Sequence, residues 1–258
     1  MRLIDSHIHC FPEPDLSKEI TLSEYPVNKY LKELSQKLKK NQIDEAVVYI
    51  LDERVLLKSI EKPNNLILGC IIGIHDKIGI FSDAASKKGI KIIKLLPYEQ
   101  KITRDKFDRV IDLATYLSEK KMVLTICSTY GSKFLFDTNG PELAAYIKKY
   151  VDIPIILAHG GGPKVFDAMS LALSYDDIYL DTSFSLIYWS GSSVIQDFAF
   201  ALKKLECERI FYGSDYPNIG FDESLTNFKD FLRTYNFSME EEENLLFNNF
   251  CKFKQEYL

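Results

Sequence analysis

The sequence predicts an α/β protein that folds as a (β/α)8 barrel of the TIM-barrel class. Eight short runs rich in Val, Ile and Leu alternate with longer amphipathic segments along the 258 residues. Nearly continuous apolar runs are typical of parallel strands whose outer face is covered by helices. No linker or low-complexity tract interrupts the alternation, so we expect one domain over residues 1–258.

Each predicted strand is one of these short apolar runs. The eight runs are Arg2–His9, Glu45–Ile50, Leu66–Ile74, Ile90–Leu96, Met122–Ser128, Ile153–His159, Ile178–Ser183 and Arg209–Asp215. An open, doubly wound sheet is the alternative architecture, and it requires a phosphate-binding glycine turn after the first strand. That position instead carries His7, His9 and Pro12, which favours the barrel.

Helices are predicted between the strands, because apolar residues recur there at intervals of three and four. In the first segment these include Leu31, Leu34 and Leu38. The predicted helices are Tyr25–Asn41, Thr103–Lys120, Glu142–Tyr150, Pro163–Ser174, Ser192–Leu205 and Ser224–Tyr235. An extra C-terminal helix is expected over Ser238–Tyr257, where Ser238 and Glu241 form a capping box at its start.

Composition limits the classes of partner. The chain is 46% hydrophobic and 27% charged, with a net charge of −5, so it has no basic surface for nucleic acid. It has no run of about 18 apolar residues that would span a membrane. Five scattered cysteines without a CxxC pair indicate reduced thiols and a cytoplasmic protein. We expect a small-molecule substrate, and a homodimer is one option that the sequence leaves open.

His7 and His9 close the first strand with one residue between them. Alternate side chains of a strand share a face, so both imidazoles point the same way and are spaced to hold one metal ion. The alternative is that the pair is polar decoration of the strand or belongs to an inert core.

Polar residues at the carboxyl ends of other strands support a shared site, because barrel enzymes build their active sites at that face. Besides the first-strand pair, these residues are His75, Lys94, Cys127, His159 and Asp215. All four histidines of the chain therefore lie at this one face.

His159 is followed by three glycines and Pro163. Amides near Gly161 can hold a carboxylate or phosphate, although a tight strand-to-helix turn explains the glycines equally well. Asp215 ends the last strand, which neighbours the first strand in a closed barrel. It is a candidate metal ligand and proton acceptor, with capping of the next turn as the alternative.

Three motifs together resemble the amidohydrolase superfamily, and more narrowly its amidohydrolase-related (type 2) branch, which includes aminocarboxymuconate-semialdehyde decarboxylase-like enzymes. The motifs are His7-Ile8-His9, Ala158-His159-Gly160-Gly161 and Gly213-Ser214-Asp215-Tyr216-Pro217. The resemblance implies a distorted barrel with one divalent metal, usually zinc, held by the histidine pair, a fifth-strand histidine and Asp215. It also implies that His159 acts as an acid or base, or polarises the substrate.

Cys127 stands where that branch has its fifth-strand histidine. A thiolate is a good zinc ligand, so Cys127 can complete the metal site; the alternative is a small apolar filler. We interpret Lys94 as a cation for a substrate carboxylate, with a salt bridge to Asp215 or Glu99 as the structural alternative. His75 either lines the substrate pocket or caps the next helix through Asp76.

We therefore expect a metal-dependent hydrolase that acts on a small, carboxylated metabolite through metal-activated water. The predicted ligands of one Zn²⁺ are His7, His9, Asp215 and Cys127. The predicted catalytic residues are Asp215 and His159, and the predicted substrate-binding residues are Lys94, His75 and Gly161. Two alternatives stay open: a metal-dependent decarboxylase of the same fold, and a degenerate barrel that binds a metabolite or partner without catalysis.

Overall fold

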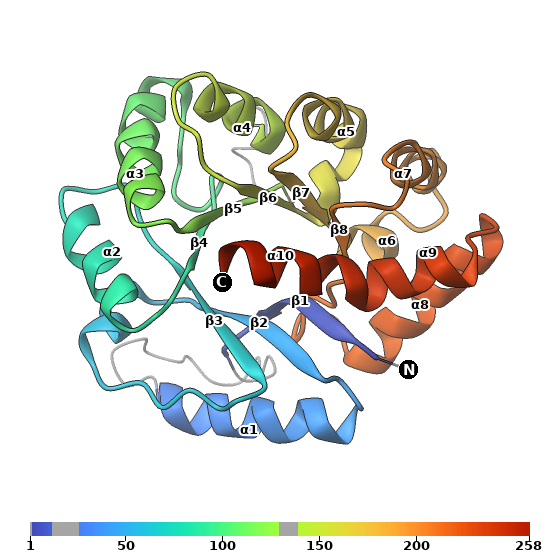
Figure 1. Ribbon diagram of the computed structural model, residues 1–258, viewed down its shortest axis with the longest axis horizontal. Helices are drawn as coiled ribbons and strands as arrows, with labels where there is room; N and C mark the ends of the chain where they lie inside the picture. Colours follow the sequence, from blue (N-terminus) through green and yellow to red (C-terminus); the bar gives the residue numbers. More distant parts are fainter. Residues whose placement is uncertain (1, 12–25, 129–138) are drawn as a thin grey trace.

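Eight parallel strands lie side by side in chain order and form one barrel (Figure 1). The computed structural model describes residues 2–11, 26–128 and 139–258. The strands are β1 (Ile4–His9), β2 (Glu45–Ile50), β3 (Leu66–Ile71), β4 (Ile92–Leu95), β5 (Val123–Cys127), β6 (Ile155–Ala158), β7 (Ile178–Asp181) and β8 (Ile210–Phe211). Backbone hydrogen bonds close the circle, from Ser6 N–H to the Tyr212 carbonyl at 2.9 Å and from His9 N–H to the Tyr216 carbonyl at 2.7 Å. The predicted eight-stranded barrel is confirmed.

Helices follow the strands and cover the outside of the barrel (Figure 1). They are α1 (Val27–Lys40), η2 (Glu53–Leu57), α2 (Ile78–Lys87), η3 (Arg104–Lys106), α3 (Phe107–Glu119), α4 (Gly140–Lys148), η4 (His159–Lys164), α5 (Val165–Ser174), α6 (Ser185–Tyr188), α7 (Ser193–Lys204) and α8 (Phe221–Thr234). Every predicted helix is present, although Tyr25, the first residue of one prediction, lies outside the described residues. Within the described ranges, no helix combines the length and apolar character needed to cross a bilayer.

Helix α2 is the helix expected after His75, but no bounds were predicted for it. Its N-cap residue, Lys77, makes no side-chain capping bond, and its first turn has no acidic residue. It also begins Ile78-Gly79, two residues with modest or poor helix propensity. The start signals by which a helix is recognised in a sequence are therefore missing here.

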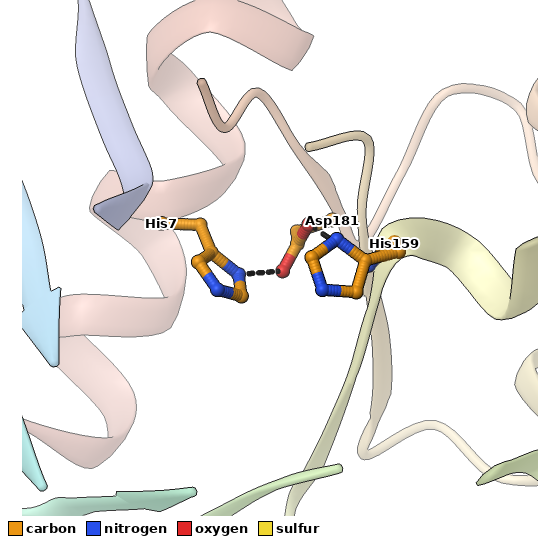
Figure 2. Close-up of side chains that lie close together, drawn as sticks. All are labelled: His7, His159 and Asp181. Carbon is orange, nitrogen blue, oxygen red and sulfur yellow. Dashed lines mark hydrogen bonds and ion pairs between the residues drawn. The ribbon is translucent and has the colours of Figure 1, made fainter. Parts of the chain in front are cut away.

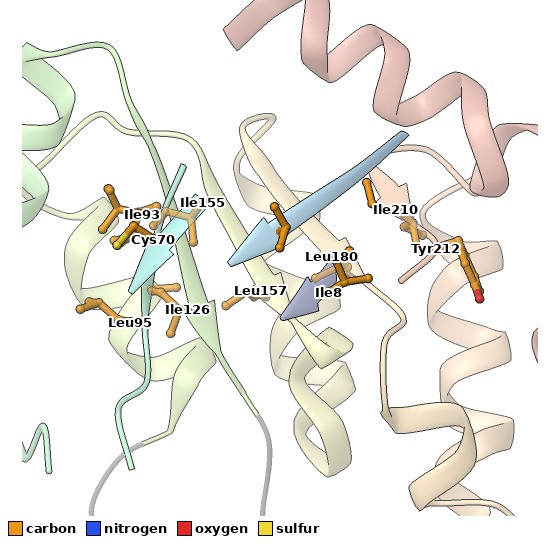
Figure 3. Close-up of a cluster of buried hydrophobic side chains, with 14 of the residues drawn as sticks. Ile8, Cys70, Ile93, Leu95, Ile126, Ile155, Leu157, Leu180, Ile210 and Tyr212 are labelled. Atoms are coloured by element: carbon orange, nitrogen blue, oxygen red, sulfur yellow. The ribbon is translucent and has the colours of Figure 1, made fainter. Parts of the chain in front are cut away.

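Side chains alternate along each strand between the helix layer and the barrel interior. In β4, Ile93 and Leu95 pack in the outer layer, whereas Ile92 lies in the interior cluster. Figure 3 shows part of this outer layer, between strands and helices. The alternation turns Lys94 inward, and in β5 it turns Cys127 inward as well. An inward-pointing polar side chain at the carboxyl end of a strand therefore lies at the mouth of the barrel.

Strand β1 switches face partway along. Its pairing with β2 shifts register between Asp5 and Ile8. Ile4 lies in the interior cluster near the strand's start. Further along, the rings of His7 and His9 lie near the interior ring of Tyr49. Even and odd positions of one strand can face the same side only where the register is interrupted. The irregularity lets β1 contribute both to the core and to the site.

The C-terminal segment covers the amino-terminal end of the barrel. It consists of α9 (Met239–Glu243), the π-helical turn η5 (Asn244–Asn248) and α10 (Asn249–Tyr257), and it crosses the barrel in Figure 1. Phe247, Phe250 and Phe253 pack among the interior residues of the strands. The capping box of Ser238 and Glu241 is formed. The predicted C-terminal helix is confirmed, with a π-turn inside it that the sequence did not indicate.

Candidate metal centre

Two sets of three donor atoms meet inside the carboxyl-terminal end of the barrel. One set is His7, His9 and Asp215, and the other is His7, His159 and Asp181, drawn in Figure 2. Within each set the donor atoms lie within 4.8 Å of one another, and all five side chains are buried. The first, sixth and eighth strands therefore bring His7, His9, His159 and Asp215 together, and the seventh adds Asp181.

Lys94 directs its ammonium at the histidine pair. Its Nζ lies 2.6 Å from Nε2 of His7 and 3.5 Å from Nε2 of His9, with the side chain buried. An ammonium only donates, so Nε2 of His7 accepts and Nδ1 of that ring carries the proton. Nδ1 lies 2.7 Å from Oδ2 of Asp181, to which it donates. His7 therefore presents a nitrogen lone pair to a cation.

Asp215 faces the same two nitrogens from beyond β8. Its Oδ1 lies 3.2 Å from Nε2 of His9 and 3.7 Å from Nε2 of His7. Its other oxygen accepts a hydrogen bond from Asn218 at 3.0 Å. The backbone of Asp215 has φ of 65°, a left-handed conformation that L-residues rarely adopt. Gly213 permits the close approach of this segment, because a Cβ there would lie 2.9 Å from Cβ of His7.

Burial sets the charge states of this first set of donors. It lowers the pKa of His7 to about 3 and that of His9 to about 4, and the Lys94 ammonium acts in the same direction. Burial alone would raise the pKa of Asp215, but the hydrogen bond from His9 and the charge of His159 hold it well below its usual value. Neutral imidazoles and an ionised carboxylate are the forms that bind metals.

His159 is oriented by the segment that follows β7. Its Nδ1 lies 3.1 Å from the carbonyl oxygen of Ser183, to which it donates, and 2.9 Å from Oγ of the same residue. It also hydrogen-bonds Cys127. Burial lowers the pKa of His159, but Cys127 and the carboxylates of Asp215 and Asp181 outweigh it and raise the pKa to about 9. At neutral pH this imidazole is therefore a proton donor.

Asp181 is the residue of this cluster that the sequence analysis missed. It ends β7 inside the predicted strand Ile178–Ser183 and points toward His7 (Figure 2). The signal was available, because Asp181 is a polar residue at the carboxyl end of an apolar run. The predicted strand continued two residues further, to Ser183, so Asp181 did not stand out as a strand-end residue.

Cys127 and Gly161 both lie close to His159. Cys127 is buried at the end of β5, and its sulfur belongs to neither three-donor set found among the described residues. Gly161 has φ of 84°, and a Cβ on it would lie 2.9 Å from Cβ of Ala168. Turn geometry is thus sufficient reason for this glycine. Its proposed anion-binding amide and the metal-binding role of Cys127 stay predictions.

His75 lies apart from the other sequence-predicted residues. It follows β3, and its Nε2 is paired with a carboxylate oxygen of Glu53. The second oxygen of Glu53 accepts a hydrogen bond from the Gly73 N–H at 2.8 Å. The His75 side chain is 41% exposed. This contact ties η2 to the loop after β3, and substrate binding by His75 stays a prediction.

The first donor set fits a divalent cation. Two neutral imidazoles and one carboxylate are a typical set of protein ligands for zinc. The nitrogens of His7 and His9 that face Asp215 also face the Lys94 ammonium, so this position already attracts positive charge.

The chain belongs to the amidohydrolase family, whose family model matches residues 81–249. This match covers more than half of the 258 residues and includes Lys94, Cys127, His159, Asp181 and Asp215. Among proteins with curated functions, none matches the chain. The resemblance drawn from the three sequence motifs is confirmed.

Solved structures with low sequence identity share the whole fold. An uncharacterised TIM-barrel protein of Bordetella bronchiseptica is 15% identical with a TM-score of 0.74, covering 100% of this chain and 99% of its own. A Pseudomonas putida protein described as a 2-pyrone-4,6-dicarboxylic acid hydrolase is 18% identical, with a TM-score of 0.69 and coverages of 100% and 98%. The 5-carboxyvanillate decarboxylase of Sphingomonas paucimobilis is 12% identical, with a TM-score of 0.61 and coverages of 98% and 99%. At these identities the likeness establishes the fold alone.

Proposed function

We propose that this protein is a metal-dependent hydrolase of a small, carboxylated metabolite. The observation that carries the proposal is the convergence of His7, His9 and Asp215 within 4.8 Å, buried at the catalytic face of the barrel. His159 lies beside this set as a proton donor, and Lys94 adds a buried cation. A cytoplasmic location and the oligomeric state stay predictions.

The metal is proposed to be a single divalent ion, Zn²⁺, held by His7, His9 and Asp215. When bound, such an ion polarises a substrate carbonyl and lowers the pKa of a water molecule. Cys127 is proposed as a fourth ligand because a sulfur at the end of β5 faces the barrel mouth, where its family relatives are expected to have histidine.

The remaining chemistry belongs to the chain's own side chains. Ionised Asp215 accepts a proton from the water that attacks the substrate carbonyl. Protonated His159 first donates a hydrogen bond to the carbonyl oxygen, and it transfers its proton only to the leaving group, as the bond between the carbonyl carbon and that group breaks. Lys94 pairs with a carboxylate of the substrate. Substrate binding by His75 and by amides near Gly161 would complete the pocket.

Decarboxylation is the second candidate reaction. It is favoured by one observation, the fold shared with a decarboxylase along 98% of this chain. The same metal ligands and the same His159 would serve, with the proton of His159 delivered to the carbon that loses CO₂. Residue types do not separate the two reactions, because both need a cation and an acid.

The proposal is tested by elemental analysis of protein purified without chelator, followed by a screen of carboxylated lactones, esters and amides. We expect about one divalent ion per chain, lost in the double variant His7→Ala/His9→Ala. Release of an acid without CO₂ supports hydrolysis, whereas CO₂ evolution supports the second candidate. Wild-type protein without metal or activity would overturn both. Unchanged zinc content in Cys127→Ser would remove Cys127 from the ligand set.

The variant Asp215→Asn tests whether Asp215 is the proton acceptor without disturbing the fold. Asparagine keeps the shape of the side chain but neither ionises nor binds metal as well as a carboxylate. We expect turnover to fall by about 100-fold or more, the usual scale for loss of a general base, with little change in the melting temperature. Normal turnover in this variant would show that Asp215 is not the proton acceptor.

A further inference from the structure

We infer that Asp181 is a positioning residue that orients both His7 and His159 through a single carboxylate. This inference rests on the proposed function, in which His7 binds the metal and His159 is the acid. Asp181 is buried beside both residues (Figure 2). Its Oδ2 hydrogen-bonds the ring of His7, and its Oδ1 accepts from the backbone N–H of His159. It does not itself need to touch metal or substrate.

The first oxygen of Asp181 and the Lys94 ammonium contact opposite nitrogens of the His7 ring. Nε2 accepts from Lys94 at 2.6 Å, so the proton sits on Nδ1, which donates to Oδ2 of Asp181 at 2.7 Å. The lone pair of Nε2 then points at His9 and Asp215, where a metal would bind. A second partner of this kind both orients a ligating histidine and increases its basicity.

The second oxygen of Asp181 builds the support of His159. Oδ1 accepts from the backbone N–H of His159 at 3.1 Å and from the N–H of Ser183 at 3.0 Å. It also accepts from the hydroxyl of Ser183. Ser183 in turn holds Nδ1 of His159 with its carbonyl oxygen and its Oγ. The carboxylate therefore fixes His159 from its backbone and, through Ser183, from its ring.

The backbone of this region requires such support. His159 has φ of 63°, and so does Phe184, the residue after Ser183. Residues in this conformation are strained and persist only where the surroundings hold them in place. Asp181 binds the amides of His159 and Ser183, which lie at and just before the two strained positions. One buried carboxylate thus stabilises the strained turns that aim the acid at the site.

The decisive variant is Asp181→Asn. Its carbonyl oxygen can still accept from the three donors at Oδ1, but its NH₂ group would face Nδ1 of His7 and could only donate to it. Because the Lys94 ammonium also favours a lone pair on Nε2 of His7, the tautomer is compared in metal-free Lys94→Met and Lys94→Met/Asp181→Asn. We expect the proton on Nδ1 in the first variant and on Nε2 in the second. The ¹⁵N chemical shifts of the imidazole nitrogens report this directly near neutral pH. We also expect the zinc affinity of Asp181→Asn, measured by competition with a chelator, to fall about 10- to 100-fold.

Ser183→Ala is the matched control, because it removes the hydroxyl that links Asp181 to the His159 ring and leaves the Ser183 carbonyl and the His7–Asp181 bond in place. We expect its zinc affinity to stay within about threefold of wild type while kcat falls with KM little changed. An Nε2–H tautomer of His7 in Lys94→Met would overturn the inference, even if Lys94→Met/Asp181→Asn does not fold. So would an unchanged His7 tautomer in the folded double variant. Wild-type protein that lacks metal overturns the proposed function instead, since the tautomer is read without metal.

Discussion

At the residue scale, the unexpected contact is between Lys94 and the candidate metal ligands. The ammonium lies 2.6 Å from Nε2 of His7, the same lone pair that a divalent ion would use. It also lies over the ring of Tyr49 at 4.9 Å, which stabilises a buried cation. Lys94 and a metal therefore compete for one nitrogen, and metal binding would release the ammonium for a substrate carboxylate.

We predict that Lys94→Met increases zinc affinity by about tenfold or more, because like charges about 4 Å apart cost several kcal/mol even at an effective dielectric constant of about 20. The same variant should increase KM for a carboxylated substrate. Competition with a chelator measures the first effect, and steady-state kinetics the second.

Lys91→Met is the control for this prediction. Lys91 precedes the same strand but lines a cavity at the opposite, amino-terminal end of the barrel, together with residues of the C-terminal helix. It should leave both quantities unchanged. Zinc affinity that falls in Lys94→Met would mean that Lys94 supports the metal site and does not compete with it.

At the scale of elements, side-chain hydrogen bonds at its N-terminus stabilise the first helix of the C-terminal segment, α9. The Oγ of Ser238 accepts a hydrogen bond from the Glu241 N–H at 3.2 Å, and the Glu241 carboxylate accepts one from the Ser238 N–H at 2.6 Å. Ser192 occupies the same position before α7, but its side chain makes no capping bond. Both serines precede a helix in the sequence, but only the side chain of Ser238 caps its helix.

Ser238→Ala is therefore expected to lower the free energy of unfolding by about 1 kcal/mol, the typical cost of losing an N-cap side chain. Ser192→Ala should cost clearly less. Chemical denaturation of the two variants beside the wild type makes the comparison. Equal losses would mean that the capping box adds nothing to stability in this protein.

At the scale of the whole molecule, the two ends of the barrel have different tasks. Polar and titratable side chains gather at the carboxyl ends of the strands, while the aromatic face of α10 fills the amino-terminal end. Phe250 is only 2% exposed, and its ring lies 5.2 Å from that of Phe211. Stability and chemistry are thus separated along the barrel axis, as in other barrel enzymes.

Phe250→Ala should consequently destabilise the fold by about 3–5 kcal/mol, the range for truncating a buried Phe, without changing zinc affinity in the folded protein. Phe200→Ala, on the outer face of α7, is the control, because that side chain is 56% exposed. Its unfolding free energy should be nearly that of the wild type. A loss of zinc binding in folded Phe250→Ala would show that the two ends are coupled.

Much of this architecture could be predicted from the sequence because its signals are local. Strands with both faces buried are continuous apolar runs, and the helix face that packs on them repeats every three to four residues. The His7–His9 pair and the polar strand ends follow from the same alternation of side chains. No bounds could be predicted for helix α2 because its start has no capping signal. Asp181 was missed because the apolar run continues past it in sequence, whereas β7 ends at Asp181 in the structure.

Only the tertiary structure decided how these residues meet. The register shift in β1 places His7 beside Asp181 and Lys94, although neither is near it in the chain. The same folding pairs His75 with Glu53, away from the cluster, despite its position at a strand end. A sequence determines which side chains reach the mouth of a barrel, because side-chain direction is a property of the strand. Which of them touch depends on strand stagger and loop geometry, and those arise only when the barrel closes.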